Sequence, residues 1–419
     1  MTEKLYDKDA YATEFTATIV SFGPIDDEAH KLTSLKGDDL YVLVLDKTLF
    51  FPEEGGQTPD KGTIKAEEKS GSTVELEVVD VQIKEDCIYH IVANPAGFSL
   101  AEGIECIGVI DWKHRYNNMQ QHSGEHIFSG LVHNTYGYDN VGFHLSDSVV
   151  TMDFNGPLTA QQIADIETRV NQAIYANIEI VPSFPTDEEL EQIDYRSKKE
   201  INGQVRLVTI PGIDICACCA PHVHRTGEVG ILKVVSAQNY KGGVRISILC
   251  GFRALELFRY DHELVTDIAA GFSTSADNIK GSIAKLQTEL SSVKQSLIQA
   301  RAELMEVELA KIPDDQQNVA FFAEEMDQNQ MRNMVNSLVE KHSGYCAVFA
   351  GDDEKGYRYI LGIKNGDARV ALEKLKQLCQ AKGGGSAQMI QGSLSGADKD
   401  TLKKTIEDMT LGDGVKGTF

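Results

Sequence analysis

Hydrophobic and polar residues alternate along much of the N-terminal part of the chain. Residues 14–110 contain the β-rich runs YVLVLD, TVELEVVDVQI and CIYHIVA, separated by glycine and acidic turns. Alternation with a period of two is typical of strands, so this region is predicted to be mostly β. Between the runs lies TLFFPEEGGQTPDKGTI, where Gly55 and Gly56 permit backbone conformations closed to other residues. Taken alone, this loop is most simply interpreted as a hairpin turn.

The spacing of apolar residues then changes from two to a helical period. A helix is predicted over 113–136, and a second over 159–178 with Thr159 as its cap. The segments around them read as strands: VGFHLSDSVVTMDF, IEIVPSF, GQVRLVTI, GEVGILKVVSAQ and GVRISILCG. Strands mixed with two helices in this way predict an α+β domain with an antiparallel sheet.

A heptad pattern follows a predicted helix at 252–272. The apolar positions advance in steps of four and three for about four heptads, which predicts a coiled coil: Ile279, Ile283, Leu286, Leu290, Val293, Leu297, Ala300, Leu304 and Val307. Pro313 ends it. This seam can fold back on the earlier helix or pair with a second copy of the chain, and the pattern leaves both arrangements open.

The remaining residues alternate between predicted helices and strands, which indicates a small α/β domain. The whole chain is therefore assigned to the α+β class, beginning with a small β-barrel-like domain. Four parts are predicted: a β domain at 1–95, an α+β domain at 96–251, a helical or coiled-coil segment at 252–313 and a small α/β domain at 314–419.

Composition narrows the functional classes. The net charge of −23 and the pI of about 4.9 oppose nucleic-acid binding, although DWKHRY, YRSKKE, HVHR and NYKGGVR are locally basic. No apolar run is long enough for a transmembrane helix, and the charged N-terminus does not resemble a signal peptide. The eight cysteines include Cys216, Cys218 and Cys219, and such crowding favours metal or thiol chemistry over disulfides. A cytoplasmic protein is expected.

The stretch QQHSGEHIFSG places His122 and His126 four residues apart, on one face of the predicted helix. The metalloprotease signature H-E-x-x-H does not fit, because the acid here is Glu125, beside the second histidine. Alone, the pair is a weak metal signal, and two hydrogen-bonded surface histidines are the alternative.

The stretch ICACCAPHVHRTGEVG supplies the other half of a metal site. Cys218 and His222 have C-x-x-x-H spacing, and together with His122 and His126 they give the four thiolate and imidazole donors that zinc prefers. Three further donors, Cys216, Cys219 and His224, leave the choice of ligands open. The cysteines can also be read as small buried hydrophobic residues. The paired motifs predict one Zn²⁺ per chain.

H-x-x-x-H followed about ninety residues later by C-x-x-x-H, then H-V-x-x-T-G-E, resembles the editing domain of alanyl-tRNA synthetases and the freestanding AlaX-like alanyl-tRNA editing proteins. LFFPEEGGQTPDKG resembles the glycine-rich motif of the family's N-terminal β domain, and KGGVRISILCGFRAL resembles the strand and helix after the second zinc motif. The coiled coil and AKGGGSAQMIQG resemble the long AlaX form, which has a C-terminal DHH-associated domain. The chain departs from the common C-G-G-T-H, having Cys219, Ala220 and Pro221 between the ligands.

The resemblance implies a hydrolase that removes serine, and sometimes glycine, from mischarged alanine tRNA. It further implies a C-terminal domain that helps to bind tRNA, and the coiled coil suggests a homodimer. Whether zinc activates water or anchors the substrate is left open. A non-catalytic, zinc-stabilised tRNA-binding module and a metallohydrolase for a small ester or amide are the competing functions.

Further site residues are assigned by their place near these motifs. Glu125 is a candidate general base or partner of a ligand, or else a surface carboxylate. Gln121 is a candidate to orient a histidine or contact substrate, or else a surface glutamine. Arg115 and Arg245 are candidates for tRNA phosphate, with salt bridges as the alternative. By analogy with the family, the substrate pocket lies near Thr48, Gly55, Gly56 and Gln57.

Overall fold

The computed structural model describes residues 1–25, 33–36, 39–68, 71–94, 96–197 and 204–410. These form two compact units, Met1–Ala276 and Asp277–Phe419. No helix in these ranges is both long enough and apolar enough to cross a membrane.

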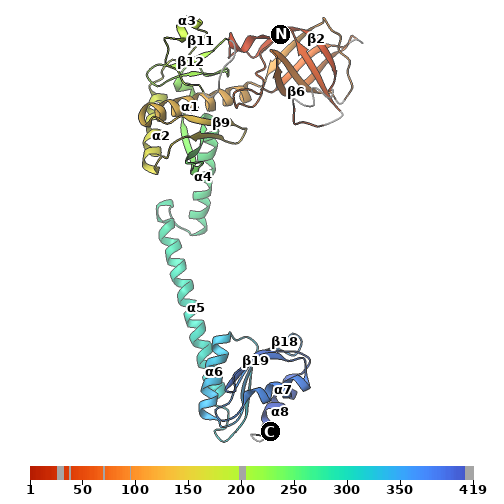
Figure 1. Ribbon diagram of the computed structural model, residues 1–419, viewed down its shortest axis with the longest axis vertical. Coiled ribbons are helices and arrows are strands. Elements are labelled where there is room, and N and C mark those ends of the chain that lie inside the picture. The colour runs from red at the N-terminus through yellow and green to blue at the C-terminus, as the bar shows by residue number, and fades with distance from the viewer. Residues whose placement is uncertain (26–32, 37–38, 69–70, 95, 198–203, 411–419) are drawn as a thin grey trace. The chain divides into compact units, whose positions relative to one another are not determined.

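The first unit begins with a closed barrel of six strands, drawn in red and orange in Figure 1. Neighbouring strands are antiparallel and follow the order β2-β3-β7-β6-β5-β8. In β6 the residues alternate between exposed and buried along TVELEV, as the sequence predicts for a strand with one face on a core. The strands are β2 (Glu14–Pro24), β3 (Leu40–Leu45), β5 (Gly62–Glu67), β6 (Thr73–Lys84), β7 (Cys87–Ala93) and β8 (Glu105–Ile110).

The last strand, β8, closes the barrel by pairing with both β2 and β5. The barrel therefore extends past the predicted boundary at 95. Two short strands, β1 (Glu3–Lys4) and β4 (Lys47–Thr48), pair in parallel beside the 3-10 helix η1 (Leu5–Asp7).

The α+β part of the first unit is built around the long helix α1 (Trp112–Tyr136). Asp111 caps its first turn, and Gly137 ends it in the left-handed conformation with φ 69°. Beside α1 lie the sheet β14-β15-β10-β9 and the smaller sheet β11-β12-β13, both antiparallel. Their strands are β9 (Asn140–Leu145), β10 (Val150–Phe154), β11 (Val181–Ser183), β12 (Leu207–Ile210), β13 (Asp214–Ala217), β14 (Leu232–Tyr240) and β15 (Gly243–Cys250).

Two other helices of this unit, α2 (Ala160–Tyr175) and α4 (Gly251–Gly271), lie close to their predicted positions, whereas the short α3 (Asp187–Leu190) and the 3-10 helix η3 (Thr226–Val229) were not predicted. In α2, Thr159 forms a capping box with Gln162. Four apolar residues at helical spacing are all buried: Ile163, Ile166, Val170 and Ile174. The α+β fold with antiparallel sheets and a barrel is confirmed.

The second unit contains the heptad segment and a small α/β sheet. A short 3-10 helix, η4 (Ala276–Asn278), leads into α5 (Ile279–Leu309), which carries the whole heptad seam. Leu286, Leu290 and Val293 on that seam are 52–64% exposed, and the coiled coil and its partner both stay predictions.

The sheet of the second unit has the order β16-β17-β18-β20-β19, and only β16 and β17 run parallel. Its strands are β16 (Val319–Ala323), β17 (Cys346–Asp352), β18 (Gly356–Gly362), β19 (Lys382–Gly385) and β20 (Met389–Leu394). The helices are α6 (Gln328–Lys341), α7 (Ala368–Leu378) and α8 (Lys399–Glu407).

Candidate metal centre

Four predicted ligands come together between α1 and the segment that follows β13. The candidate ligand atoms of His122, His126, Cys218 and His222 all lie within 4.8 Å of one another. Nε2 of His122 is 3.5 Å from Sγ of Cys218, and Nε2 of His222 is 3.4 Å from the same sulfur. Cys218 is half-buried and the three imidazoles are buried, so the cluster is a largely enclosed group of one thiol and three imidazoles.

The second ring nitrogen of each imidazole is held by a different partner. Nδ1 of His122 is 2.8 Å from Oε1 of Gln57, which is in the glycine-rich loop of the barrel. Nδ1 of His126 is 2.9 Å from Oδ2 of Asp214, at the start of β13. Nδ1 of His222 is 3.0 Å from Oγ of Ser123 on α1. With Nδ1 engaged in each ring, Nε2 is left to face the cluster, and such outer partners are typical of metal-bound histidines.

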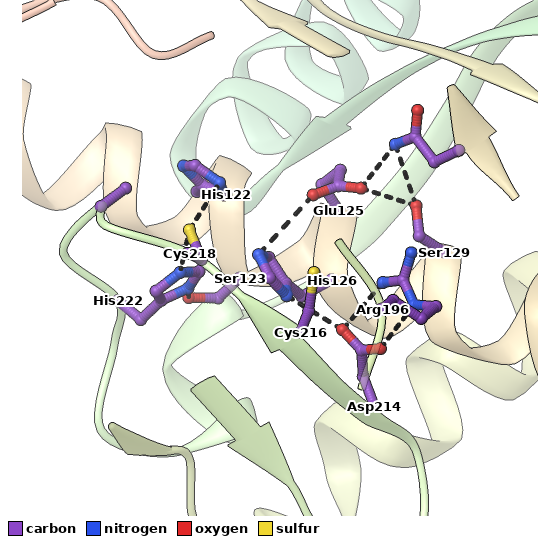
Figure 2. Close-up of polar contacts among 12 residues, drawn as sticks. His122, Ser123, Glu125, His126, Ser129, Arg196, Asp214, Cys216, Cys218 and His222 are labelled. Carbon is purple, nitrogen blue, oxygen red and sulfur yellow. Dashed lines mark hydrogen bonds and ion pairs between the residues drawn. The ribbon is translucent and has the colours of Figure 1, made fainter. Parts of the chain in front are cut away.

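Figure 2 shows His126 between two groups, with His122, Cys218 and His222 on one side and the pair of Asp214 and Arg196 on the other. Nε of Arg196 donates to Oδ1 of Asp214 at 2.7 Å, and Nη2 donates to Oδ2 at 2.9 Å. This ion pair fixes the carboxylate that orients His126.

The electrostatics of the cluster favour a thiolate. Burial alone raises the pKa of the Cys218 thiol, but the three surrounding histidines lower it well below its ordinary value. Burial lowers the pKa of His222 to about 3, so this imidazole is neutral, as a metal ligand must be. Burial also lowers the pKa of His126, but Asp214 and Cys218 outweigh it and raise the pKa to about 9.

The donor set fits a metal ion. Nε2 of His126 is buried and has no hydrogen-bond partner in the described part of the chain, although buried polar atoms are normally paired. An ion held by these four donors would satisfy that nitrogen and neutralise the buried thiolate. The residues of this chain that would hold it are His122, His126, Cys218 and His222.

The three further potential donors, Cys216, Cys219 and His224, lie outside the cluster of four. Cys216 is buried on β13 and belongs to a second group of potential donors with His126 and Asp214. Arg196 binds that Asp214, so a cation there would meet a guanidinium. Cys219 is not in either group, and burial raises its pKa above the usual range. His224 is exposed and also outside both groups.

The glycine-rich loop reaches the cluster through Gln57. Gly55 and Gly56 have φ of 63° and 83°, which only glycine adopts readily. A Cβ added at Gly56 would lie 2.7 Å from the backbone oxygen of Phe143, so the loop packs directly against β9. A Cβ at Gly55 would lie 3.3 Å from Sγ of Cys219, beside the ligand Cys218.

Thr48 belongs to a separate network inside the barrel. Its Oγ1 is 2.9 Å from Nε2 of the buried His90 and accepts a hydrogen bond from the backbone of Phe50. A contact of Thr48 with substrate stays a prediction.

Gln121 is fully buried and binds backbone, not a histidine. Its Nε2 donates to the oxygen of Cys250 at 2.8 Å, and its Oε1 accepts from the nitrogen of Cys250 at 2.7 Å. This side chain therefore joins α1 to the start of α4. A direct catalytic role for Gln121 is not supported by this position.

Arg115 and Arg245 both form salt bridges, which the sequence analysis gave as the alternative to contact with tRNA phosphate. The guanidinium of Arg115 is fully buried against Asp60 of the glycine-rich loop, with Nε 2.9 Å from both carboxylate oxygens. Arg245 is paired with Asp153 at 2.6 Å and lies over the ring of Tyr240. The buried position of Arg115 favours a structural role, whereas Arg245 is partly exposed. A contact of either with tRNA stays a prediction.

Glu125 is not a surface carboxylate. It is fully buried, its Oε1 accepts hydrogen bonds from Ser129 at 2.6 Å and Asn140 at 2.7 Å, and its Oε2 lies 3.9 Å from Nε2 of His126 (Figure 2). The carboxylate is therefore oriented from one side and faces the cluster with the other.

Sequence reasoning missed two of the residues that orient the candidate ligands. Asp214 and Arg196 give no motif of their own, and their roles depend on which strand lies beside α1, whereas Ser123 lies within H-S-G-E-H. Asp214 is only two residues before Cys216, and an acid this close to a cysteine cluster is the one signal that was available.

Two family models match parts of the chain. Residues 2–114, which include the barrel, match the family described as tRNA synthetases class II (A). Residues 205–247, which include Cys218 and His222, match the threonyl and alanyl tRNA synthetase second additional domain.

Relatives match the chain over nearly its full length. It is 27% identical to the alanyl-tRNA editing protein AlaX-L of Pyrococcus horikoshii, over 98% of both chains. It is 26% identical to the alanyl-tRNA editing protein Aarsd1 of Rattus norvegicus, over 93% of both. Alanine–tRNA ligase of Ignicoccus hospitalis is 30% identical, over 73% of this chain and 32% of the ligase.

Proposed function

We propose that this chain, which belongs to the family of alanyl-tRNA editing proteins, is a trans-acting hydrolase that deacylates mischarged alanine tRNA. The expected substrates are seryl- and also glycyl-tRNA. The observation that carries the proposal is the enclosed cluster of one thiol and three imidazoles with the buried carboxylate of Glu125 beside it.

We propose that the cluster holds one Zn²⁺. Thiolate and imidazole are the donors that zinc prefers, and His122, His126, Cys218 and His222 would supply the four donors that it usually takes. When bound, zinc supplies a Lewis acid that polarises an ester carbonyl or a water molecule.

The protein groups have separate roles in the proposed hydrolysis. Gln57, Asp214 and Ser123 keep the three imidazoles in the orientation that faces the thiol. Glu125 accepts the proton of the attacking water through Oε2, while Ser129 and Asn140 hold its other oxygen. Gly55 and Gly56 allow the barrel loop to approach the site closely, so we assign the loop to substrate positioning.

A second candidate is a tRNA-binding module in which zinc is purely structural. It is favoured by the four protein donors, because a catalytic zinc usually has three and keeps one position open. In that case the protein binds tRNA without turning it over.

One experiment separates these functions. The full chain is incubated with a panel of tRNAs charged with serine, glycine or alanine, with and without a chelator, and ester loss is followed. We expect fast loss from seryl-tRNA(Ala), none from alanyl-tRNA(Ala), and no activity with the chelator or in His122→Ala. Binding of uncharged tRNA with no faster ester loss than in buffer would favour the structural module instead.

A further inference from the structure

The segment that carries His222 also carries an exposed imidazole that the proposed chemistry does not use. The ring of His224 stacks on the ring of Tyr11, with centroids 3.9 Å apart and planes 19° apart. None of the hydrogen bonds among the described residues involves the ring nitrogens of His224, and the residue is exposed. One face of this imidazole therefore rests on Tyr11, and the residue as a whole is exposed.

Tyr11 supports the imidazole ring of His224 and is itself held in place by several contacts. Its hydroxyl donates to Oε2 of Glu228 at 2.5 Å and accepts the backbone N–H of His224 at 3.1 Å. Its ring packs against Trp112, with centroids 5.3 Å apart, and against Tyr116 at 6.4 Å. His224 is thus held through its backbone and through one face of its ring by the same tyrosine.

The stack lies beside the metal centre. His224 follows the ligand His222 by two residues, so their Cα atoms are at most about 7 Å apart. In the proposed reaction the cleaved ester is at the 3′ end of the tRNA, where the last bases are unpaired. Unpaired RNA bases are commonly bound by stacking on aromatic side chains, including histidine.

The negative charge of the chain favours base stacking over phosphate contacts as a way to bind RNA. A protein with a net charge of −23 gains little from general attraction to phosphate, whereas base stacking does not need positive charge. We propose that the imidazole of His224, supported by Tyr11, is the platform on which the 3′-terminal base of the tRNA stacks. This inference rests on the proposed function, because that function is what brings the 3′ end to the cluster.

The test uses uncharged RNA, so it does not depend on catalysis. A hairpin copying the acceptor stem of alanine tRNA carries 2-aminopurine in place of its 3′-terminal adenosine, and stacking quenches its fluorescence. The Zn²⁺-loaded full chain should quench it. His224→Phe should keep the quenching, because it keeps a planar ring. His224→Leu should lose it and bind about 5- to 100-fold more weakly, since leucine covers Tyr11 without offering a ring face.

Two controls sharpen the outcome. Tyr260→Leu removes another exposed aromatic side chain, 63% exposed on α4, and should bind and quench like the unaltered protein. With 2-aminopurine placed within the paired stem, the fluorescence should not change when the protein is added. Equal quenching by the unaltered protein and His224→Leu would overturn the inference, even if deacylation is found. Quenching that depends on His224 without any deacylation would support the platform and refute the proposed reaction.

Discussion

At the scale of single residues, the three imidazoles of the cluster differ in what holds them. Burial lowers the pKa of His126, but the carboxylate of Asp214 and the thiol of Cys218 outweigh it and raise that pKa to about 9. Ser123, a neutral hydroxyl, leaves His222 with a pKa lowered by burial to about 3. The partners therefore set both the orientation and the electron donation of each ring.

Glu125 is the residue on which the proposed chemistry can be tested most directly. Glu125→Gln keeps an oxygen that can accept from Ser129 and Asn140 but removes the proton acceptor that faces His126. We expect kcat for deacylation to fall about 100-fold or more with metal content unchanged. Glu167→Gln is the control and should leave kcat unaltered, because Glu167 lies on α2 and its carboxylate pairs with Lys233, outside the cluster. Full activity in Glu125→Gln would mean that the carboxylate only supports the fold.

His90 gives the barrel a predictable dependence on pH. Burial lowers its pKa from 6.5 to about 4, so the unfolded chain takes up a proton at higher pH than the folded barrel. The contribution of neutral His90 to stability is present above pH 6.5 and is lost as the pH falls toward 4. We expect a loss of about 2 kcal/mol from this residue between pH 7 and pH 5.

The measurement compares the unaltered protein with His90→Gln, which cannot take up a proton in this range. Urea unfolding at pH 7 and pH 5 can be followed through Trp112, the single tryptophan of the chain. Other groups that titrate, including the metal ligands, are common to both proteins. The difference in unfolding free energy between the two should therefore change by about 2 kcal/mol, and a constant difference would contradict the prediction.

At the scale of elements, helices were predicted better than the sheet. The helix expected at 113–136 is Trp112–Tyr136, and the one expected at 252–272 is Gly251–Gly271, because caps and apolar spacing are local signals. Closure of the barrel depends on β8 meeting β2 and β5, which lie far away in the sequence. The clustering of His122, His126, Cys218 and His222 was predicted from their chemistry, but Gln121 and Arg115 were assigned to the site although both are fully buried on α1.

The exposed seam of α5 can be tested through the mass of the protein in solution. We expect a second copy of the chain to cover it, since Leu290 is 53% exposed and the heptads continue on both sides of it. Leu290→Glu should convert a dimer into a monomer in sedimentation equilibrium at micromolar concentration. Ser291→Glu adds the same charge beside the seam and should leave the dimer intact. A monomeric unaltered protein would show that the seam does not pair between copies.

At the scale of the whole molecule, the clusters of possible metal ligands in the described part of the chain are confined to one unit. Both groups of donors found among the described residues lie within Met1–Ala276. Removing the metal should lower the unfolding temperature of this unit by about 10 °C or more and leave that of Asp277–Phe419 unchanged. Calorimetry with and without a chelator, with hydrogen exchange to assign each transition, measures this. Equal shifts in both transitions would contradict a metal centre confined to the first unit.

The separation of the candidate ligands along the chain determines when the site can form during synthesis. His122 and His126 precede Cys218 by about ninety residues, so both histidines are synthesised well before the thiol exists. Two imidazoles on a helix hold an ion only loosely, and the full site must wait for β13 to dock. Metal capture would therefore be a late step that marks completion of the first unit, and a nascent chain without β13 should exchange its ion freely with the surroundings.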